Sequence, residues 1–548
     1  MAKHPISRIL VLGGYGGFGA RLTRRLAGRG HHVLVAGRSA EKAADFCAGL
    51  AGTQPVVADR NGDIDRLLAN YQPDLLIDAA GPFQGSSYEV PLACARAAVP
   101  YIDLADARAF VADIVSLDEA ARAGGVPIIA GASSVPALSG AVARHLARSL
   151  DTVRDVEIAI SASNRATRGA SVVAAILSYV GQPVRLWRAR RWTHAYGWQE
   201  LRRRTFTIEG TPPLKGRWLA IADVPDLDLL PEMLPGRPAV TFRAGTDVAL
   251  QTLGLWLFSW PVRWFKVETL ARLTPAASWL QRMTRPLASD RSAMSVVLKG
   301  LAGGRRIKRR WTLIADDGDG PEIPTLAAEL LAEMVLAGKV APGARDASRL
   351  LDLEQFEPLF STLSVKHGTV ETELPQPLYE RAMGAGYAAM PQAVREMHDL
   401  CGDGGASGEA EVERGRNIVA RLIGWVMRFP PAGKHALHVA FAECGDGETW
   451  TRAFGLYAFS SRFSQEAGGL VECFGPLRFR FELSADATGL TMNMCGWSVF
   501  GVPLPLALAP RSRAREWEEG GRFRFDVPIS LPFIGLVVHY SGWLTPDR

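Results

Sequence analysis

Residues 6–19 read ISRILVLGGYGGFG and decide the fold of the N-terminal part of the chain. The stretch 6–12 is rich in leucine and β-branched residues, which predicts a buried parallel strand. A GxGxxG turn follows over 14–19 and leads into a helical pattern over 20–29. A glycine turn between a strand and a helix lets a pyrophosphate approach the helix N-terminus. The sequence therefore predicts a dinucleotide site made by Gly14, Tyr15, Gly16, Gly17, Phe18 and Gly19.

Five more strand-like runs follow at regular intervals. They cover residues 32–36, 55–58, 75–79, 101–104 and 126–130, and helical patterns lie between most of them. Strands that alternate with helices are typical of a doubly wound parallel sheet. We therefore expect an α/β protein whose residues 1–150 form a Rossmann domain.

The end of the second predicted strand indicates which dinucleotide is bound. NAD-binding proteins place an acidic residue there, whereas this chain has Arg38 followed by Ser39. A guanidinium pairs with a 2′-phosphate, so the sequence favours NADP. Asp59 could contact the adenine, or it could equally cap a turn. Residues Ala80, Gly81, Pro82 and Phe83 follow the fourth strand at the carboxyl edge of the sheet, where cofactors bind in such folds.

Several motifs together resemble the saccharopine dehydrogenase-like family. They are the glycine turn, the AGR of residues 36–38, the AAGPF of 79–83, the GASSVP of 131–136 and the IPTLAA of 323–328. The resemblance covers roughly residues 6–365. It implies an NADP-dependent oxidoreductase in which a second α/β domain faces the Rossmann domain across a cofactor cleft. This chain has Ala132 and Ser133 where the family has Phe-Asp.

The remaining chain is expected to form two further domains. Residues 151–370 look like a second α/β domain with a mixed sheet and an aromatic insert near 250–285. Residues 375–548 resemble a bacterial domain of unknown function, through motifs such as the WTRAF of 450–454 and the YSGWL of 540–544. Short alternating strands there, including 449–459 as one strand, predict an antiparallel sheet that forms a barrel or half-barrel. The GDGGASG of residues 402–408 predicts a flexible linker.

Candidates for the chemistry lie near the ends of the predicted strands. Tyr101 could donate a proton and Asp103 could orient a substrate, although both fit equally well as a core residue and a turn cap. Ser133 and Ser134 could bind substrate, or they could cap the helix that follows. Arg168 lies before a predicted helix and could bind an anionic substrate group. No spacing of cysteines and histidines indicates a metal site.

Composition limits the possible partners. A net charge of +6 over 548 residues gives no argument for nucleic acid. The N-terminus shows no targeting pattern, so we expect a cytoplasmic protein. Tryptophans lie beside cations over 253–279, a pattern that could contact the inner face of the membrane, line a pocket or cover an interface.

Three functions remain open from the sequence. The first is a reductase that acts on an apolar, lipid- or polyketide-like small molecule. The others are a saccharopine-type amino-acid dehydrogenase, and an NADP-binding sensor or scaffold without turnover. A homodimer is an open alternative to a monomer.

Overall fold

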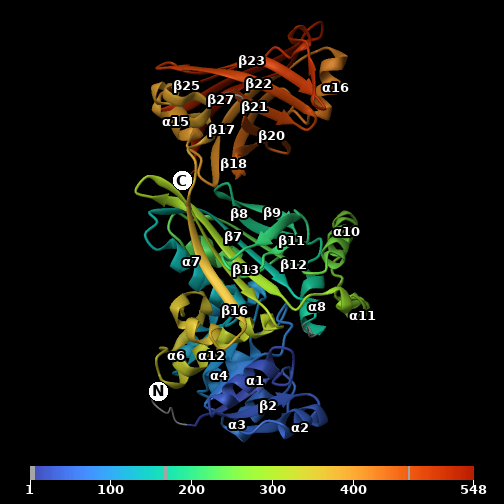
Figure 1. Ribbon diagram of the computed structural model, residues 1–548, viewed down its shortest axis with the longest axis vertical. Coiled ribbons are helices and arrows are strands. Elements are labelled where there is room, and N and C mark those ends of the chain that lie inside the picture. The colour runs from blue at the N-terminus through green and yellow to red at the C-terminus, as the bar shows by residue number, and fades with distance from the viewer. Residues whose placement is uncertain (1–5, 166–169, 467–468, 548) are drawn as a thin grey trace.

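The computed structural model describes residues 6–165, 170–466 and 469–547. Three large sheets follow one another along the longest axis of the molecule (Figure 1). The α/β class with an antiparallel C-terminal part, expected from the sequence, is confirmed.

The first sheet is the parallel, doubly wound sheet that the strand pattern predicts. Its seven strands have the order β15-β6-β5-β4-β1-β2-β3, with helices between them. The edge strand β15 (Gly343–Asp346) pairs with β6 after the chain has already built the second sheet. One strand of the segment 151–370, which we expected to form a single domain, therefore belongs to the first sheet. The other strands are β1 (Arg8–Leu12), β2 (His32–Gly37), β3 (Thr53–Val57), β4 (Leu75–Asp78), β5 (Tyr101–Asp103) and β6 (Pro127–Ala130).

The second sheet is mixed and has the order β10-β11-β12-β7-β13-β14-β16. Only β12 and β7 run parallel, and the other neighbours are antiparallel. The hairpin of β8 (Pro183–Arg188) and β9 (Arg191–Tyr196) forms a separate two-stranded sheet. The strands are β7 (Thr152–Ala162), β10 (Arg202–Phe206), β11 (Leu214–Ile221), β12 (Ala239–Thr246), β13 (Ser292–Ala302), β14 (Arg305–Ala315) and β16 (Val365–Glu373).

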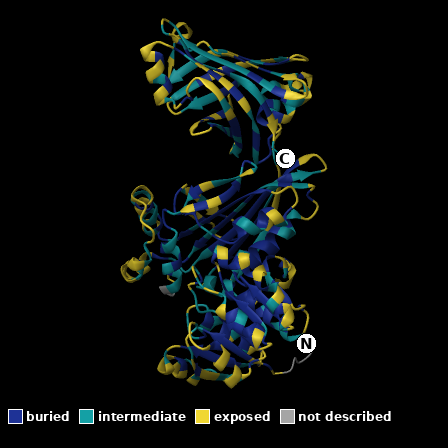
Figure 2. Cartoon of the chain, turned by 180° about the vertical axis from the view of Figure 1, so that it is seen from behind, coloured by how far each residue is buried: buried dark blue, intermediate teal, exposed yellow. Residues whose placement is uncertain are grey.

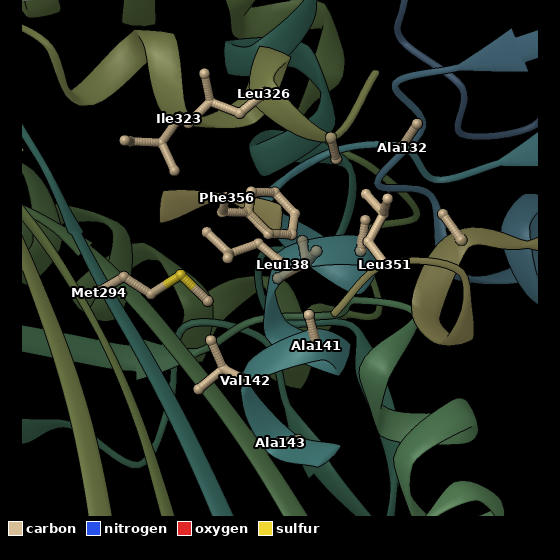
Figure 3. Close-up of a cluster of buried hydrophobic side chains, with 14 of the residues drawn as sticks. Ala132, Leu138, Ala141, Val142, Ala143, Met294, Ile323, Leu326, Leu351 and Phe356 are labelled. Atoms are coloured by element: carbon tan, nitrogen blue, oxygen red, sulfur yellow. The ribbon is translucent and has the colours of Figure 1, made fainter. Parts of the chain in front are cut away.

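A shared core joins these two sheets. Helices α7 (Ser139–Ala147) and α12 (Ile323–Leu336) lie between them, and Leu138, Leu326 and Phe356 pack together without exposed surface (Figure 3). Burial of each such side chain stabilises the junction by roughly 1.5–3 kcal/mol. Arg29 follows directly after α1 (Gly19–Gly28) and forms an ion pair of 2.7 Å with the buried Glu329 of α12. This ion pair connects α1 to α12. The two sheets therefore share one continuous apolar cluster.

The aromatic insert consists of short helices on one side of the second sheet. They are α10 (Ala249–Phe265) and α11 (Thr274–Met283), and α11 packs on α8 (Ala170–Ser178). None of the described helices has the length and apolarity to cross a membrane. Many large apolar side chains of the insert nevertheless face solvent, including Trp264 and Phe265, which are 67% and 78% exposed.

The C-terminal sheet closes on itself. Its eleven strands run antiparallel. The pairing of β22 with β23 closes ten of them into a ring, and β24 pairs with β23 outside this ring. The alternating burial of strands such as β22 follows from an apolar interior and a solvated exterior. The strands are β17 (Asp403–Arg414), β18 (Gly433–Cys444), β19 (Gly447–Phe454), β20 (Tyr457–Glu466), β21 (Gly469–Phe474), β22 (Leu477–Asp486), β23 (Gly489–Val499), β24 (Val502–Leu504), β25 (Arg513–Glu519), β26 (Arg522–Leu531) and β27 (Gly535–Pro546).

Short helices flank this barrel. Helices α14 (Leu378–Met383) and α15 (Gln392–His398) precede it, and α16 (Ile418–Val426) connects β17 to β18. The ring of Tyr379 stacks on that of His398, with 3.7 Å between the ring centroids, and both residues are buried in the barrel core. Residues 402–408, expected to be a linker, instead lie at the start of β17, and the strand expected over 449–459 turns at Gly455 into two strands.

Candidate functional site

The glycine turn packs tightly between the ends of β2 and β4. The N–H groups of Gly13 and Gly14 both donate to the Ala36 carbonyl, at 2.8 and 3.2 Å. Gly13 has φ +71°, and a Cβ there would lie 3.0 Å from the Ala79 carbonyl oxygen. A Cβ on Gly19 would overlap the Gly13 carbonyl, so helix α1 can begin here only with glycine. The turn has the tight geometry that a dinucleotide cradle requires.

Tyr15 connects this turn to the end of β2. Its hydroxyl accepts the Ser39 N–H at 2.9 Å, and its ring fills the space that a Cβ on Gly37 would occupy. Ser39 caps α2 (Ala40–Ala48) by accepting the Lys42 N–H. The Arg38 side chain is exposed, and it makes no hydrogen bond or ion pair within the described ranges. Arg38 is therefore available to an anion beside a helix N-terminus.

Asp59 is exposed at the start of the turn after β3. Its carboxylate accepts the Asn61 N–H at 3.0 Å, and its carbonyl accepts the Gly62 N–H. This contact matches the turn-capping alternative for Asp59.

The loop after β4, which contains Ala80, Gly81, Pro82 and Phe83, is held by a buried ion pair. The Arg60 Nε donates to the Asp78 carboxylate at 2.6 Å, and the Arg60 guanidinium lies over the Phe83 ring at 4.9 Å. Asp78 also accepts the Ala80 N–H at 3.0 Å. Burial raises the pKa of Asp78, and the charge of Arg60 opposes that rise. Sequence reasoning missed Arg60, because its partner lies 18 residues away.

Tyr101 and Asp103 lie inside the first sheet. Both are fully buried on β5, and neither lines the cavity described below. Asp103 accepts the N–H groups of Ala105 at 2.9 Å and Gly131 at 2.8 Å, which fixes two loops at the carboxyl edge. Burial raises the pKa of Asp103 to about 7. These contacts make Asp103 a positioning residue, and a catalytic role for Tyr101 or Asp103 stays a prediction.

A cavity of about 280 Å³ lies between the glycine turn and the second sheet. Gly17 and Phe18 form one wall, and the opposite wall comes from β7, β12, β13 and β14. The lining is largely apolar, with side chains such as Phe242, Met294 and Leu313. No Arg, Lys or His is among the described residues that line it.

Several polar residues interrupt this apolar wall. Among them are Ser133, Ser134, Gln84, Asp106 and Trp198. Asp106 is solvent-accessible within the cleft and accepts a hydrogen bond from Gln84 at 3.2 Å. Surrounding protein desolvates the carboxyl and raises its pKa. The Trp198 indole N–H is buried and has no hydrogen-bond partner within the described chain.

The predicted serines thus reach the site, whereas Arg168 lies outside the described residues. The sequence did not single out Asp106, Gln84 or Trp198. Asp223 also lines the cavity, but it pairs with Arg108 at 3.0 Å.

Comparisons with known proteins agree with this architecture. A model of the NAD dependent epimerase/dehydratase family matches residues 9–99, and a domain of unknown function (DUF4166) matches residues 390–544. Among curated proteins, no relative matches the chain.

Three solved structures illustrate what the chain is similar to. A saccharopine dehydrogenase (L-Glu forming) from Saccharomyces cerevisiae is 14% identical over 66% of this chain and 100% of its own, with a TM-score of 0.44. An amine dehydrogenase from Mycobacterium smegmatis is 14% identical over 64% of this chain and 98% of its own, with a TM-score of 0.38. A yeast methylglyoxal/isovaleraldehyde reductase complexed with NADPH is 15% identical over 18% of this chain and 37% of its own, with a TM-score of 0.15.

The N-terminal family match and the parallel sheet support an NAD(P)-dependent oxidoreductase joined to a domain of unknown function. This is the resemblance that the sequence motifs suggest. The substrate and the choice between NAD and NADP are not determined by these matches.

Proposed function

We propose that the protein is an NADPH-dependent reductase that acts on an apolar substrate in the cavity beside the glycine turn. The observation that carries this proposal is the cavity wall, which is apolar and has no cation among its described residues. A dicarboxylic amino acid needs cations to bind its carboxylates, so this wall argues against a saccharopine-type substrate. An apolar carbonyl or enoyl thioester fits the wall by burying its apolar surface.

The preference for NADPH rests on Arg38. Its side chain has no partner within the described chain and lies beside the capped N-terminus of α2, where a 2′-phosphate is favoured. Calorimetric titration with NADPH and NADH tests this assignment. The Arg38→Gln variant is expected to lose about tenfold or more in NADPH affinity and little in NADH affinity. The Arg66→Gln variant is the matched control, because the Arg66 side chain is also exposed and makes no hydrogen bond or ion pair within the described part of the chain. Equal NADPH binding by both variants would refute the role of Arg38.

Asp106 is the proposed proton donor. NADPH supplies the hydride, and the substrate oxygen or α-carbon needs one proton to complete a reduction. The raised pKa of Asp106 keeps a proton on its carboxyl to higher pH, and its solvent-accessible position gives it contact with the cavity. Ser133 and Ser134 line the cavity and are proposed to orient the polar end of the substrate.

Oxidation of NADPH with a panel of apolar carbonyls and enoyl thioesters tests this chemistry. The Asp106→Asn variant is expected to lower kcat by roughly 10²–10⁴ while the Kd for NADPH stays unchanged. The Asp223→Asn variant is the control, because this second carboxylate at the cavity is committed to Arg108. Tight NADPH binding without turnover of any substrate would favour a sensor or scaffold instead.

The aromatic insert is proposed to contact a membrane surface. Trp264 and Phe265 are exposed at the end of α10, and Arg263, Lys266 and Arg272 lie nearby in the chain. An apolar face rimmed by cations suits the interface of an anionic bilayer. Helix α8, which packs on α11, carries residues of the cavity wall. The insert could therefore bring an apolar substrate close to its cavity.

Sedimentation of wild-type protein and a Trp264→Ser/Phe265→Ser variant with anionic vesicles tests this contact. The variant is expected to bind more weakly, because it loses two interfacial aromatic side chains. Equal binding would refute the contact. Sedimentation without vesicles reports whether the chain forms the homodimer left open by the sequence.

A further inference from the structure

The barrel presents a chemically distinct end to solvent. Its strands alternate in direction, so every second connection lies at the same end as α16 (Figure 1). We define this end, the distal rim, as residues 415–434, 455–457, 475–478, 500–513 and 531–536. The described turns at the opposite end, 445–446, 487–488 and 520–521, contain only small or acidic residues and one threonine.

Large apolar side chains on the distal rim are exposed. Trp425 is 78% exposed, Leu456 100%, Phe500 83% and Phe533 99%, and each comes from a different connection. Isolated exposed apolar residues are common, but a gathering from four separate connections marks an interaction surface. Figure 2 shows exposed residues on α16 and the outer loops of the barrel. Further exposed members are Ile418, Leu422, Val426, Val502, Leu506 and Leu508.

The charge of the distal rim has one sign only. The five segments contain no Asp or Glu, whereas the whole chain has 56 acidic residues. Their seven cations are Arg416, Arg421, Arg428, Lys434, Arg478, Arg511 and Arg513. Arg478 forms an ion pair with Glu466, which lies outside the five segments. An apolar surface with a largely cationic margin matches a surface that is apolar inside and anionic outside.

A groove beside α16 combines both chemistries. Its volume is about 540 Å³, and its lining includes Arg414, Arg416, Arg421, Trp425 and Tyr457. Arg414 is held by the carbonyls of residues 429 and 430 at 3.0 Å. Within the described chain, the side chains of Arg416 and Arg421 make no hydrogen bond or ion pair. Free guanidinium groups beside aromatic rings suit the phosphates of lipid head groups.

We propose that the distal rim docks on an anionic lipid surface. The exposed aromatic residues enter the boundary between head groups and acyl chains, and Arg416 and Arg421 bind head-group phosphates. A protein partner would have to supply an acidic face, whereas an anionic bilayer supplies the charge and the apolar layer together. This docking uses different residues from the α10–α11 contact and does not depend on the reductase activity.

Vesicle sedimentation of the full-length protein tests the docking. The probes are vesicles of phosphatidylglycerol with phosphatidylcholine, and vesicles of phosphatidylcholine alone. We expect binding to the anionic vesicles that weakens when salt is raised to about 0.5 M. The Trp425→Ser/Phe533→Ser variant and the Arg416→Gln/Arg421→Gln variant are each expected to lower the partition coefficient about tenfold. All four side chains are exposed, so these variants should unfold at the wild-type temperature.

Matched controls separate this proposal from the others. The Trp264→Ser/Phe265→Ser variant removes two exposed aromatic residues from α10 instead. When the rim substitutions are added to this variant, they should lower its vesicle binding further by the same factor. The Kd for NADPH, measured in the same samples, should not change. Failure of wild-type protein to bind anionic vesicles would overturn the docking, as would rim variants that bind like wild type. Binding of inorganic phosphate by a protein that does not bind vesicles would indicate a site for free phosphate. That result would also overturn the docking.

Discussion

Replacing Asp103 by Asn tests whether this residue is an element of the fold. In the structure, one carboxylate oxygen accepts the N–H groups of Ala105 and Gly131, and the other has no hydrogen-bond partner within the described chain. Asn keeps the accepting oxygen and cannot ionise. The variant should therefore behave like wild-type protein whose Asp103 is permanently protonated.

The magnitude follows from the pKa of Asp103, which burial raises from 3.8 to about 7. A carboxyl with a raised pKa in the folded state stabilises the fold at low pH. That stability is lost as pH rises from 3.8 through about 7, because ionisation is then easier in the unfolded chain. At about 1.4 kcal/mol per pKa unit, the loss amounts to about 4 kcal/mol above pH 7. For a domain of this size it corresponds to a Tm change on the order of 10 °C.

The assay is thermal unfolding of wild type and Asp103→Asn from pH 5 to pH 8. The difference between the two Tm values removes the contributions of other buried carboxyls, such as Asp226 and Asp403. The variant is expected to be more stable than wild type by about 1–2 kcal/mol already at pH 5, and the difference should grow to about 4 kcal/mol near pH 7 and then level off. A difference that does not change with pH would refute the reasoning. If the variant loses turnover while its Tm stays unchanged, the result would support a catalytic role for Asp103.

Other substitutions test the cofactor edge and the domain junction. Arg60→Met leaves the buried Asp78 charge unpaired and is expected to cost about 3–5 kcal/mol in the unfolding free energy, measured by urea titration. Gly37→Ala places a methyl group in the space of the Tyr15 ring and should weaken NADPH binding in calorimetry by about tenfold or more, while Tm falls by a few degrees. Gly405→Ala places a methyl group against a carbonyl of the β8–β9 connection. It should open the barrel junction, which faster proteolysis between the second sheet and the barrel would reveal.

The Rossmann sheet could be predicted because its signals are local. Each of its first six strands is a short apolar run, and the glycine turn over 14–19 directly joins a strand to a helix. The strand β15 could not be predicted to join them, because it returns to the first sheet more than 200 residues after β6. Pairing across such a separation leaves no periodic signal in the sequence.

Two predictions for the barrel failed because glycine residues were interpreted incorrectly. Gly405 and Gly408 suggested a linker, but each lies where a neighbouring backbone leaves no room for a Cβ. Glycine in a strand serves close approach as well as flexibility, and only the fold distinguishes the two. Gly455, by contrast, has φ +62° and turns the chain within a run that reads as one strand. Its neighbour Leu456 is apolar, so composition gave no turn signal there.

Sequence motifs singled out the cavity residues whose positions depend on the backbone. They did not single out cavity residues that come together only through side-chain packing. Gly17, Phe18, Ser133 and Ser134 line the cavity as expected for strand-end motifs. Asp106 lies only three residues beyond Asp103, but Asp103 is the last residue of β5 and is buried in the sheet, whereas Asp106 lies in the loop after β5, at the cavity. The exposure of a carboxylate, and hence its chemistry, depends on packing that a single sequence does not report.

Charged contacts fix the barrel to the second sheet. Glu443 of β18 binds Lys299 at 3.4 Å and also pairs with Arg306, and Asp403 accepts the Ala189 N–H at 2.6 Å. Opening a hinge at this junction would break these three contacts together, which disfavours the open state. Helix α16 and the α10–α11 insert project on the same side of the molecule in Figure 1. If both apolar surfaces meet one lipid surface, a junction without a hinge holds the reductase cavity at a fixed distance from that surface. The C-terminal domain would then serve the reductase by positioning it.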